Sequence, residues 1–192
     1  MRKIRIIISV IAVVVMICLF SVGCKIASID NPLKELNASM ENTSQVSGAK
    51  IKIEVKAGSE LVYSERTEYK VKSSEVEYST IVKKPSTDIW QKDDLSESVS
   101  EGVIQKSEFL KILPCRTTIT ESDVDGEITK NVLGARAVYE FTLHSADKFV
   151  GEEAKNVSAN VEMRSENDKI TYVKIEYSLD GYKVEKIYEL DN

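Results

Sequence analysis

Side chains that could act as nucleophiles, bases or metal ligands are few and widely separated in this sequence. His144 is the only histidine, and Cys115 is the one cysteine that lies outside the N-terminal stretch. Cys115 follows Pro114 and an apolar run, which is typical of a small buried hydrophobic side chain rather than a reactive thiol. Nucleophilic catalysis needs a base beside the nucleophile, and zinc needs clustered Cys or His ligands. We therefore expect no enzymatic activity, no cofactor and no metal.

The carboxylates also favour a structural interpretation. Asp123, Asp125 and Gly126 match part of a calcium loop, but other ligands before the glycine and the glutamate at loop position 12 are missing. A hairpin turn is the better interpretation of this segment. Other acidic side chains alternate with apolar ones and are interpreted as a solvated strand face: Glu65, Glu68, Glu75 and Glu77.

Cys24 is a candidate for covalent modification because of the residues that precede it. A basic start is followed by an apolar run at residues 6–20, interrupted only by Ser9, and small residues lead to the cysteine. This order is typical of a secretory signal, and the run is short for a bilayer-spanning helix, which takes about 20 apolar residues. The stretch resembles the lipobox of bacterial lipoproteins, except that Ser21 stands where that pattern prefers leucine. The resemblance implies cleavage before Cys24 and diacylglyceryl transfer to its thiol.

The two interpretations of the N-terminal stretch agree on topology. In the first, residues 1–23 are a lipoprotein signal peptide, residues 24–30 are a lipidated tether, and residues 31–192 are a single domain. In the second, the apolar run stays as a membrane helix and Cys24 is incidental. Both place the remaining chain on the extracytoplasmic face of the cell membrane. Two acyl chains are enough for stable anchoring.

Composition restricts the possible partners and the means of stabilisation. The sequence has 26 basic and 31 acidic side chains, a net charge of −5, and no basic stripe, which argues against nucleic acid as a partner. With Cys18 in the signal and Cys24 acylated, Cys115 has no cysteine to pair with. Packing alone must stabilise the domain, which we expect to be a monomer.

The first part of the domain predicts a helix followed by three strands. Asn31 and Pro32 are typical of a helix start, and three apolar side chains then follow at helical spacing: Leu33, Leu36 and Met40. After residue 49 the period changes to two. Three segments place apolar side chains on one face and charged ones on the other, which predicts an antiparallel meander: residues 49–57, 61–72 and 75–82.

The rest of the chain predicts a helical insert and a second meander. Leu95, Val99 and Val103 are spaced as on a helix, and Pro114 would stop it, so we expect a helical lid over residues 95–113. Strands are expected on both sides of a turn at Asp123 to Gly126, a helical turn or two at residues 145–155, and two further hairpins. Asp180-Gly181 is the strongest hairpin signal.

This layout resembles the LolA/LppX-type lipoprotein-carrier family over nearly the whole mature chain. The order of elements carries the resemblance, together with the pattern of residues 131–179, which contains no position-specific motif. The resemblance implies an α+β fold, in which a strongly curved antiparallel half-barrel is covered by helices on one face. It also implies an apolar cavity between the two layers that binds acyl chains.

Two functions are compatible with these features. The first is a lipid-anchored extracytoplasmic protein that binds a lipid or another hydrophobic ligand between sheet and helices. The second is a cell-envelope protein-interaction module with a solid core and no ligand. For the first, the expected ligand contacts are apolar residues on the sheet and helix faces: Leu36, Met40, Ile51, Ile53, Tyr63, Tyr78, Leu110 and Val161.

Overall fold

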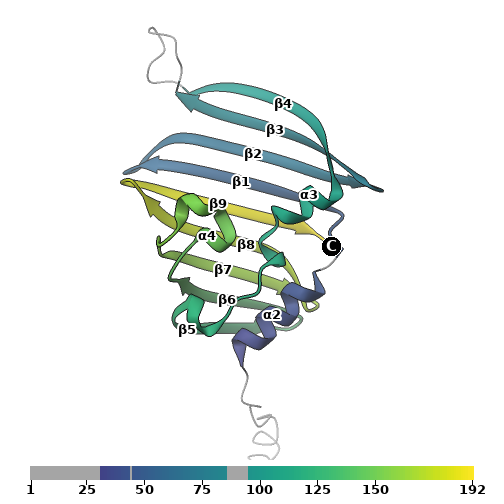
Figure 1. The fold of residues 1–192 in the computed structure, drawn as a ribbon, viewed down its shortest axis with the longest axis vertical. Helices are drawn as coiled ribbons and strands as arrows, with labels where there is room; N and C mark the ends of the chain where they lie inside the picture. Colours follow the sequence, from purple (N-terminus) through teal and green to yellow (C-terminus); the bar gives the residue numbers. More distant parts are fainter. Residues whose placement is uncertain (1–30, 44, 86–94) are drawn as a thin grey trace, which may run out of the picture. The chain divides into compact units, whose positions relative to one another are not determined.

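A computed structural model describes residues 31–43, 45–85 and 95–192, and its main element is a nine-stranded antiparallel sheet (Figure 1). The strands are β1 (Gly48–Ala57), β2 (Glu60–Lys72), β3 (Glu75–Pro85), β4 (Leu95–Gln105), β5 (Val124–Leu133), β6 (Arg136–Leu143), β7 (Ala159–Glu166), β8 (Lys169–Leu179) and β9 (Tyr182–Asp191). The helices are α2 (Pro32–Asn42), α3 (Lys106–Lys111) and α4 (Asp147–Val150), with 3₁₀ turns η1 (Pro114–Arg116), η2 (Glu121–Asp123) and η3 (Glu152–Ala154).

The strand order is β4-β3-β2-β1-β9-β8-β7-β6-β5, so two meanders meet at the centre of the sheet. There the last strand, β9, pairs with the first strand, β1, along the whole of both strands. Tight turns fix the register of the hairpins. Asp180 and Gly181 both have positive φ, 51° and 84°, and this is the conformation that a two-residue hairpin turn requires.

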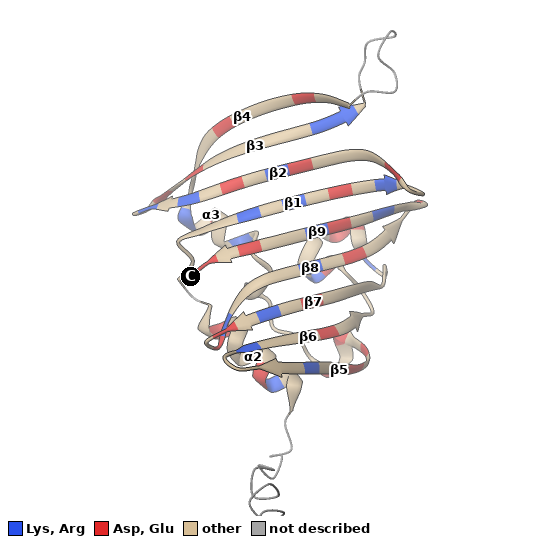
Figure 2. Cartoon of the chain, turned by 180° about the vertical axis from the view of Figure 1, so that it is seen from behind, with Lys and Arg blue, Asp and Glu red and all other residues tan. Residues whose placement is uncertain are grey.

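Side chains of the strands alternate between an inner face, on the side where the helices lie, and a more exposed outer face. Charged residues recur along the strands of the sheet (Figure 2). On β6 the odd-numbered residues are buried and point inward, and the even-numbered ones are more exposed. The outer face carries exposed cross-strand ion pairs such as Lys83 with Glu97, at 3.1 Å. Exposed pairs of this kind add little stability, about 0–1 kcal/mol each, so the inner face must supply most of it.

The inner face of β6–β8, parts of β1, β3 and β9, and the helices form one hydrophobic core. Leu36 and Met40 of α2 pack into it together with buried residues of the sheet such as Met163, Val173 and Ile175. α2 contacts β8 and β5, which places it over the second meander. The predicted first helix, its apolar stripe and most strands of both meanders are confirmed.

Residues 95–105, predicted to be part of a helical lid, instead form the edge strand β4. The spacing of Leu95, Val99 and Val103 fits a helix, but it also places all three on one face of a strand. Val99 and Val103 are 62% and 56% exposed on the outer face, so they are not a buried helical stripe. The inward positions are small residues that pair with β3: Ser96, Ser98, Ser100 and Gly102. Only Lys106–Lys111 of the predicted insert is helical.

The expected half-barrel is also wrong, because the sheet is open and neither closed nor strongly curled. Closing a barrel requires the two edge strands to approach with matched tilt and stagger. Here β4 and β5 stand at opposite ends of the strand order, and the longest helix among the described residues has 11 residues. The fold is therefore mostly β rather than evenly α+β.

The segment that leads into β5 differs from the prediction as well. Residues 116–122 form no strand, and Asp125 and Gly126 belong to β5 instead of closing a hairpin turn. The register between β5 and β6 shifts between Asp125 and Thr129, so the glycine lies in an irregular stretch of a strand. An irregular position in a strand can require glycine, as a tight turn does. For this reason the sequence suggested a hairpin turn here.

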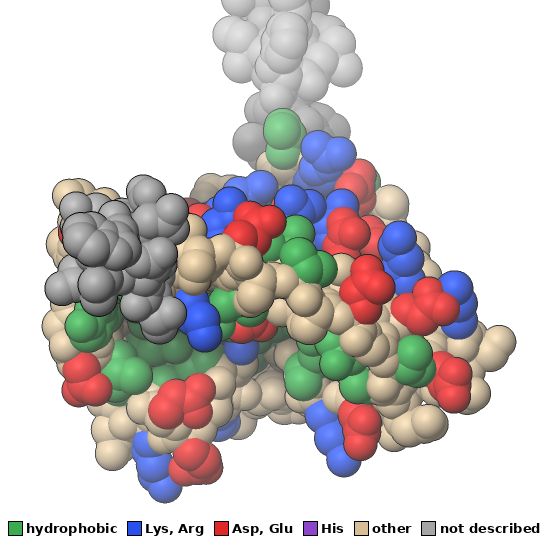
Figure 3. All heavy atoms as spheres, turned by 90° about the horizontal axis from the view of Figure 1, so that it is seen from above, with side chains coloured by type: hydrophobic (Ala, Val, Ile, Leu, Met, Phe, Trp, Pro, Cys, Tyr) green, Lys and Arg blue, Asp and Glu red, His purple; other side chains and the backbone are tan. Residues whose placement is uncertain are grey.

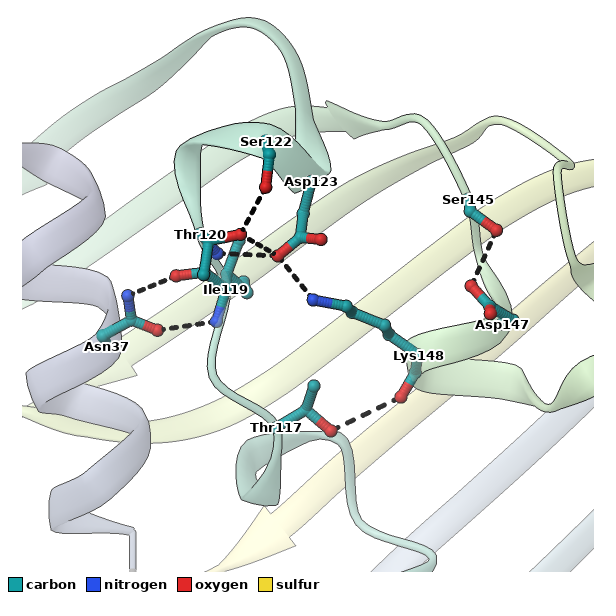
Figure 4. Close-up of polar contacts among 9 residues, drawn as sticks. All are labelled: Asn37, Thr117, Ile119, Thr120, Ser122, Asp123, Ser145, Asp147 and Lys148. Atoms are coloured by element: carbon teal, nitrogen blue, oxygen red, sulfur yellow. Dashed lines mark hydrogen bonds and ion pairs between the residues drawn. The ribbon is translucent and has the colours of Figure 1, made fainter.

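Polar contacts fix this segment against α2 and α4 (Figure 4). The Asn37 side chain donates to the Ile119 carbonyl at 2.8 Å and accepts from the Ile119 N–H at 3.0 Å. Asp123 accepts from the Thr120 N–H at 2.7 Å and from Lys148 at 2.6 Å. Burial alone would raise the pKa of the Asp123 carboxyl, but the bonds from Lys148 and Thr120 outweigh it and lower that pKa.

The predicted signal peptide, tether and lipidation site, Cys24 included, lie outside the described residues. Residues 32–192 form one compact unit. Within the part of the chain that the structure describes, no helix is both long and apolar enough to cross a bilayer.

Candidate functional site

The helices cover the inner face unevenly, and this defines the candidate site. They lie mainly over the second meander and over one end of β1–β4, where α3 contacts β3 and β4 (Figure 1). The remaining inner face of β1–β3 and β9 carries side chains that are half-buried, except Thr67, which is buried. We call this surface the inner-face site: Ile53, Val55, Tyr63, Glu65, Thr67, Thr80, Val82 and Lys186. Seen from the β4 side, hydrophobic side chains are visible between charged ones that lie along both edges of the view (Figure 3).

Strand register brings these residues together. Ile53 lies between Glu65 of β2 and Lys186 of β9, and Glu65 is in turn opposite Val82 of β3. The row continues to Ile175 of β8, which is fully buried in the core. The site is therefore an apolar surface that contains two charged side chains of opposite sign, two strands apart.

Glu65 is held by its neighbours on β2. The Tyr63 hydroxyl donates to Glu65 Oε2 at 2.6 Å, and the Thr67 hydroxyl donates to Glu65 Oε1 at 3.4 Å. Thr67 also contacts the Thr80 hydroxyl at 2.9 Å. Burial and the bond to Glu65 raise the pKa of Tyr63 to about 12, so this hydroxyl remains a donor at neutral pH. The carboxylate keeps a fixed position within an otherwise apolar surface.

Lys186, in contrast to Glu65, is not held by hydrogen bonds to neighbouring side chains among the described residues. Its ammonium forms no ion pair or hydrogen bond with any residue in the described ranges, and it lies 5.3 Å from the centre of the Tyr188 ring. Burial lowers the pKa of Lys186, although the charges of Glu153 and Glu65 act in the opposite direction. A half-buried ammonium without a partner is costly, which makes this side chain a candidate ligand contact.

The structure separates the eight residues proposed from sequence as ligand contacts. Ile53 and Tyr63 belong to the inner-face site, and Tyr78 lies nearby, with its ring centre 6.1 Å from that of Tyr69. The others lie in the closed core or pack against it: Leu36, Met40, Ile51, Leu110 and Val161. Beneath α2 the layers are in contact, so those residues pack against protein.

Sequence reasoning missed the charged residues of the site. Glu65 was assigned to a solvated face, but it has the same parity as Tyr63 and Thr67 and therefore points inward. Lys186 has the parity of its buried neighbours Val184 and Tyr188. Both residues occupy alternating positions that are otherwise apolar. A charged residue at such a position indicates an inward-pointing charge, and this could have been recognised from the sequence.

Other features offer less to a hydrophobic ligand. A depression of about 470 Å³ over β2–β4 has four charged residues in its lining: Glu68, Lys70, Glu77 and Glu101. A second, of about 380 Å³, lies over β5–β8 and is predominantly polar. Cys115 is buried, as expected, and burial raises the pKa of its thiol. Among the described residues, no three His, Cys, Asp or Glu side chains group to hold a metal ion.

No protein-family model matches this sequence, and a search of curated proteins finds no similar one. The functional assignment therefore depends on the geometry and chemistry of the inner-face site.

Proposed function

We propose that this protein is a lipid-anchored extracytoplasmic protein, similar in role to the LolA/LppX-type carriers, that binds a lipid or acyl chain at the inner-face site. The observation that carries the proposal is the uneven cover of the sheet. Ile53, Val55 and Val82 are half-buried on the inner face, whereas the same face of β6–β8 is closed by packing.

An acyl chain is the occupant that fits this surface energetically. Each buried methylene contributes about 0.8 kcal/mol, so a chain that buries ten of them gains about 8 kcal/mol before the entropy cost of binding. Across the pleated surface from β9 to β3, the apolar side chains Val55 and Val82 lie near Ile53, which separates Lys186 from Glu65. A chain lying across these strands would convert the half-buried side chains into a closed core.

Lipid binding is tested on the full-length chain, purified from membranes in a non-ionic detergent. We expect native mass spectrometry to detect bound lipid on the wild-type chain. The Val82→Gln variant should reduce that binding about tenfold, because it places a polar amide in the acyl path and burial of a valine is worth about 1.5–3 kcal/mol.

Ile81→Gln is the matched control. Ile81 is half-buried on the same strand but points to the outer face, so its variant should bind as the wild type does. A wild-type chain that binds no lipid, or two variants with equal losses, would contradict the proposal.

The anchor is part of the same proposal. We expect the mature chain to lack residues 1–23 and to carry a diacylglyceryl group on Cys24, which supplies two acyl chains for membrane retention. The Cys24→Ala variant should lose the acyl mass and change its processing, as measured by intact mass and membrane fractionation. An unchanged mass together with unchanged retention would refute lipidation.

Protein interaction is the second candidate, and one observation favours it. β4 is an edge strand with Val99 and Val103 exposed, and an open edge of this kind can pair with another chain. Lipid-free wild-type protein in the mass measurement would favour this alternative.

A further inference from the structure

The two charged residues of the inner-face site restrict which lipid headgroup can bind there. The inference drawn from them rests on the proposed lipid-binding function. Lys186 and Glu65 share one row across the sheet, with only Ile53 between them. Neighbouring strands are about 4.8 Å apart, so the two backbones are separated by roughly 10 Å. The side chains form no ion pair with each other, and Ile53 lies between the cation and the anion.

The other charged and titratable groups around Lys186 also restrict the choice of ligand. Glu153 of η3 and Glu65 both act on the Lys186 ammonium by charge, while Tyr188 contacts it through its ring. Tyr177 is influenced by Glu153 as well. Two carboxylates therefore stand near one ammonium. A ligand that carries only negative charge would gain from Lys186 but be repelled by both glutamates.

A headgroup with both signs of charge avoids this conflict. Its anionic oxygens can accept from Lys186, and its ammonium can donate to the Glu65 carboxylate, which still has acceptor capacity beside Tyr63 and Thr67. Charge-assisted hydrogen bonds are the strong ones, particularly where water is partly excluded. The acyl chain would then continue over Val55 and Val82.

We propose that the inner-face site recognises a zwitterionic phospholipid headgroup, with Lys186 binding the phosphate and Glu65 binding the ammonium. Lys186 and Glu65 can contact the same headgroup because both side chains point to the same apolar surface. Their strands, β9 and β2, both pair with β1. A neutral lipid would leave the half-buried Lys186 without a partner. An anionic lipid would leave Glu65 without its cation.

In the test, the full-length chain in non-ionic detergent is mixed with equal amounts of three single-chain lipids that have the same acyl group. These are lysophosphatidylethanolamine, lysophosphatidylglycerol and a monoacylglycerol, and native mass spectrometry measures the bound ratio. We expect the wild type to prefer the zwitterion about tenfold over the neutral lipid, since the neutral lipid cannot form charge-assisted hydrogen bonds with Lys186 and Glu65.

Two variants should change the ratio in different directions. Lys186→Met should remove the preference for either phosphate-containing lipid while retaining the monoacylglycerol. Glu65→Gln keeps an acceptor for Tyr63 and Thr67, and it should shift the preference from the zwitterion toward the anionic lipid. The matched controls, Lys183→Met and Glu68→Gln, lie on the outer faces of the same two strands and should not change the ratio.

The outcomes separate the two proposals. Binding of all three lipids without headgroup preference, or variants that leave the ratio unchanged, overturns the headgroup assignment and leaves lipid binding intact. Binding of none of them overturns both. Free phosphoethanolamine, offered alone, should bind far more weakly than the lipid. Equally tight binding of this soluble compound would show that the site recognises the charged group without an acyl chain, which overturns the assignment to a lipid.

Discussion

Replacing Phe109 with alanine should destabilise the domain by about 3–5 kcal/mol, the usual cost of removing a buried aromatic ring. Phe109 is 0% exposed, and its ring centre lies 5.2 Å from that of Tyr69 on β2. α3 has six residues and no side-chain N-cap, so side-chain packing must hold it on the sheet. Chemical denaturation followed by circular dichroism measures the loss.

The matched control for Phe109 is Ile112→Ala, in the same segment but 40% exposed, for which we expect a change of at most about 1 kcal/mol. Phe109→Leu should fall between the two because it keeps much of the buried volume. Equal losses for Phe109→Ala and Ile112→Ala would contradict the role of the ring in fixing α3.

Replacing Thr43 with valine should cost about 1–3 kcal/mol although the two side chains have similar shapes. Thr43 is 1% exposed. Its hydroxyl donates to the Ser39 carbonyl and accepts from the Ile170 N–H, both at 2.7 Å. Valine would leave a buried N–H of β8 without a partner, and the same denaturation measurement reports the cost.

Thr142→Val is the corresponding control. The Thr142 hydroxyl bonds Asn160 at 3.1 Å on the exposed face, where water can replace the contact. We expect a change within about 0.5 kcal/mol. If both threonine variants lose the same stability, the junction between α2 and β8 does not depend on the Thr43 hydroxyl. Faster hydrogen exchange at Ile170 in the Thr43→Val variant would locate the effect.

Strand periodicity made much of the fold predictable. Because successive side chains on a strand point to opposite faces, the alternation in β1, β7 and β9 defined both the strand and its buried side. The prediction from hydrophobic periodicity was wrong at residues 95–105. A spacing of four fits a helix and one face of a strand equally well, and sequence alone did not reveal that β3 has a partner there.

The candidate site was only partly predictable. Ile53 and Tyr63 were identified from alternation, whereas Glu65 and Lys186 were overlooked because charge was taken to indicate exposure. Which apolar residues pack and which stay half-open depends on where short helices end. That placement follows from contacts such as Phe109 with Tyr69, between residues 40 positions apart in sequence. A contact between residues so far apart in sequence cannot be predicted from a local pattern.

The central position of β9 has a consequence for biogenesis. Each meander can form as its residues emerge, but the two remain separate sheets with exposed edges until the C-terminal strand arrives to join them. Contacts between chain ends are slow to form because a long loop must close first. We therefore expect the pairing of β1 with β9 to be a late step of folding, and deletion of Tyr182–Asp191 would remove the junction of both halves.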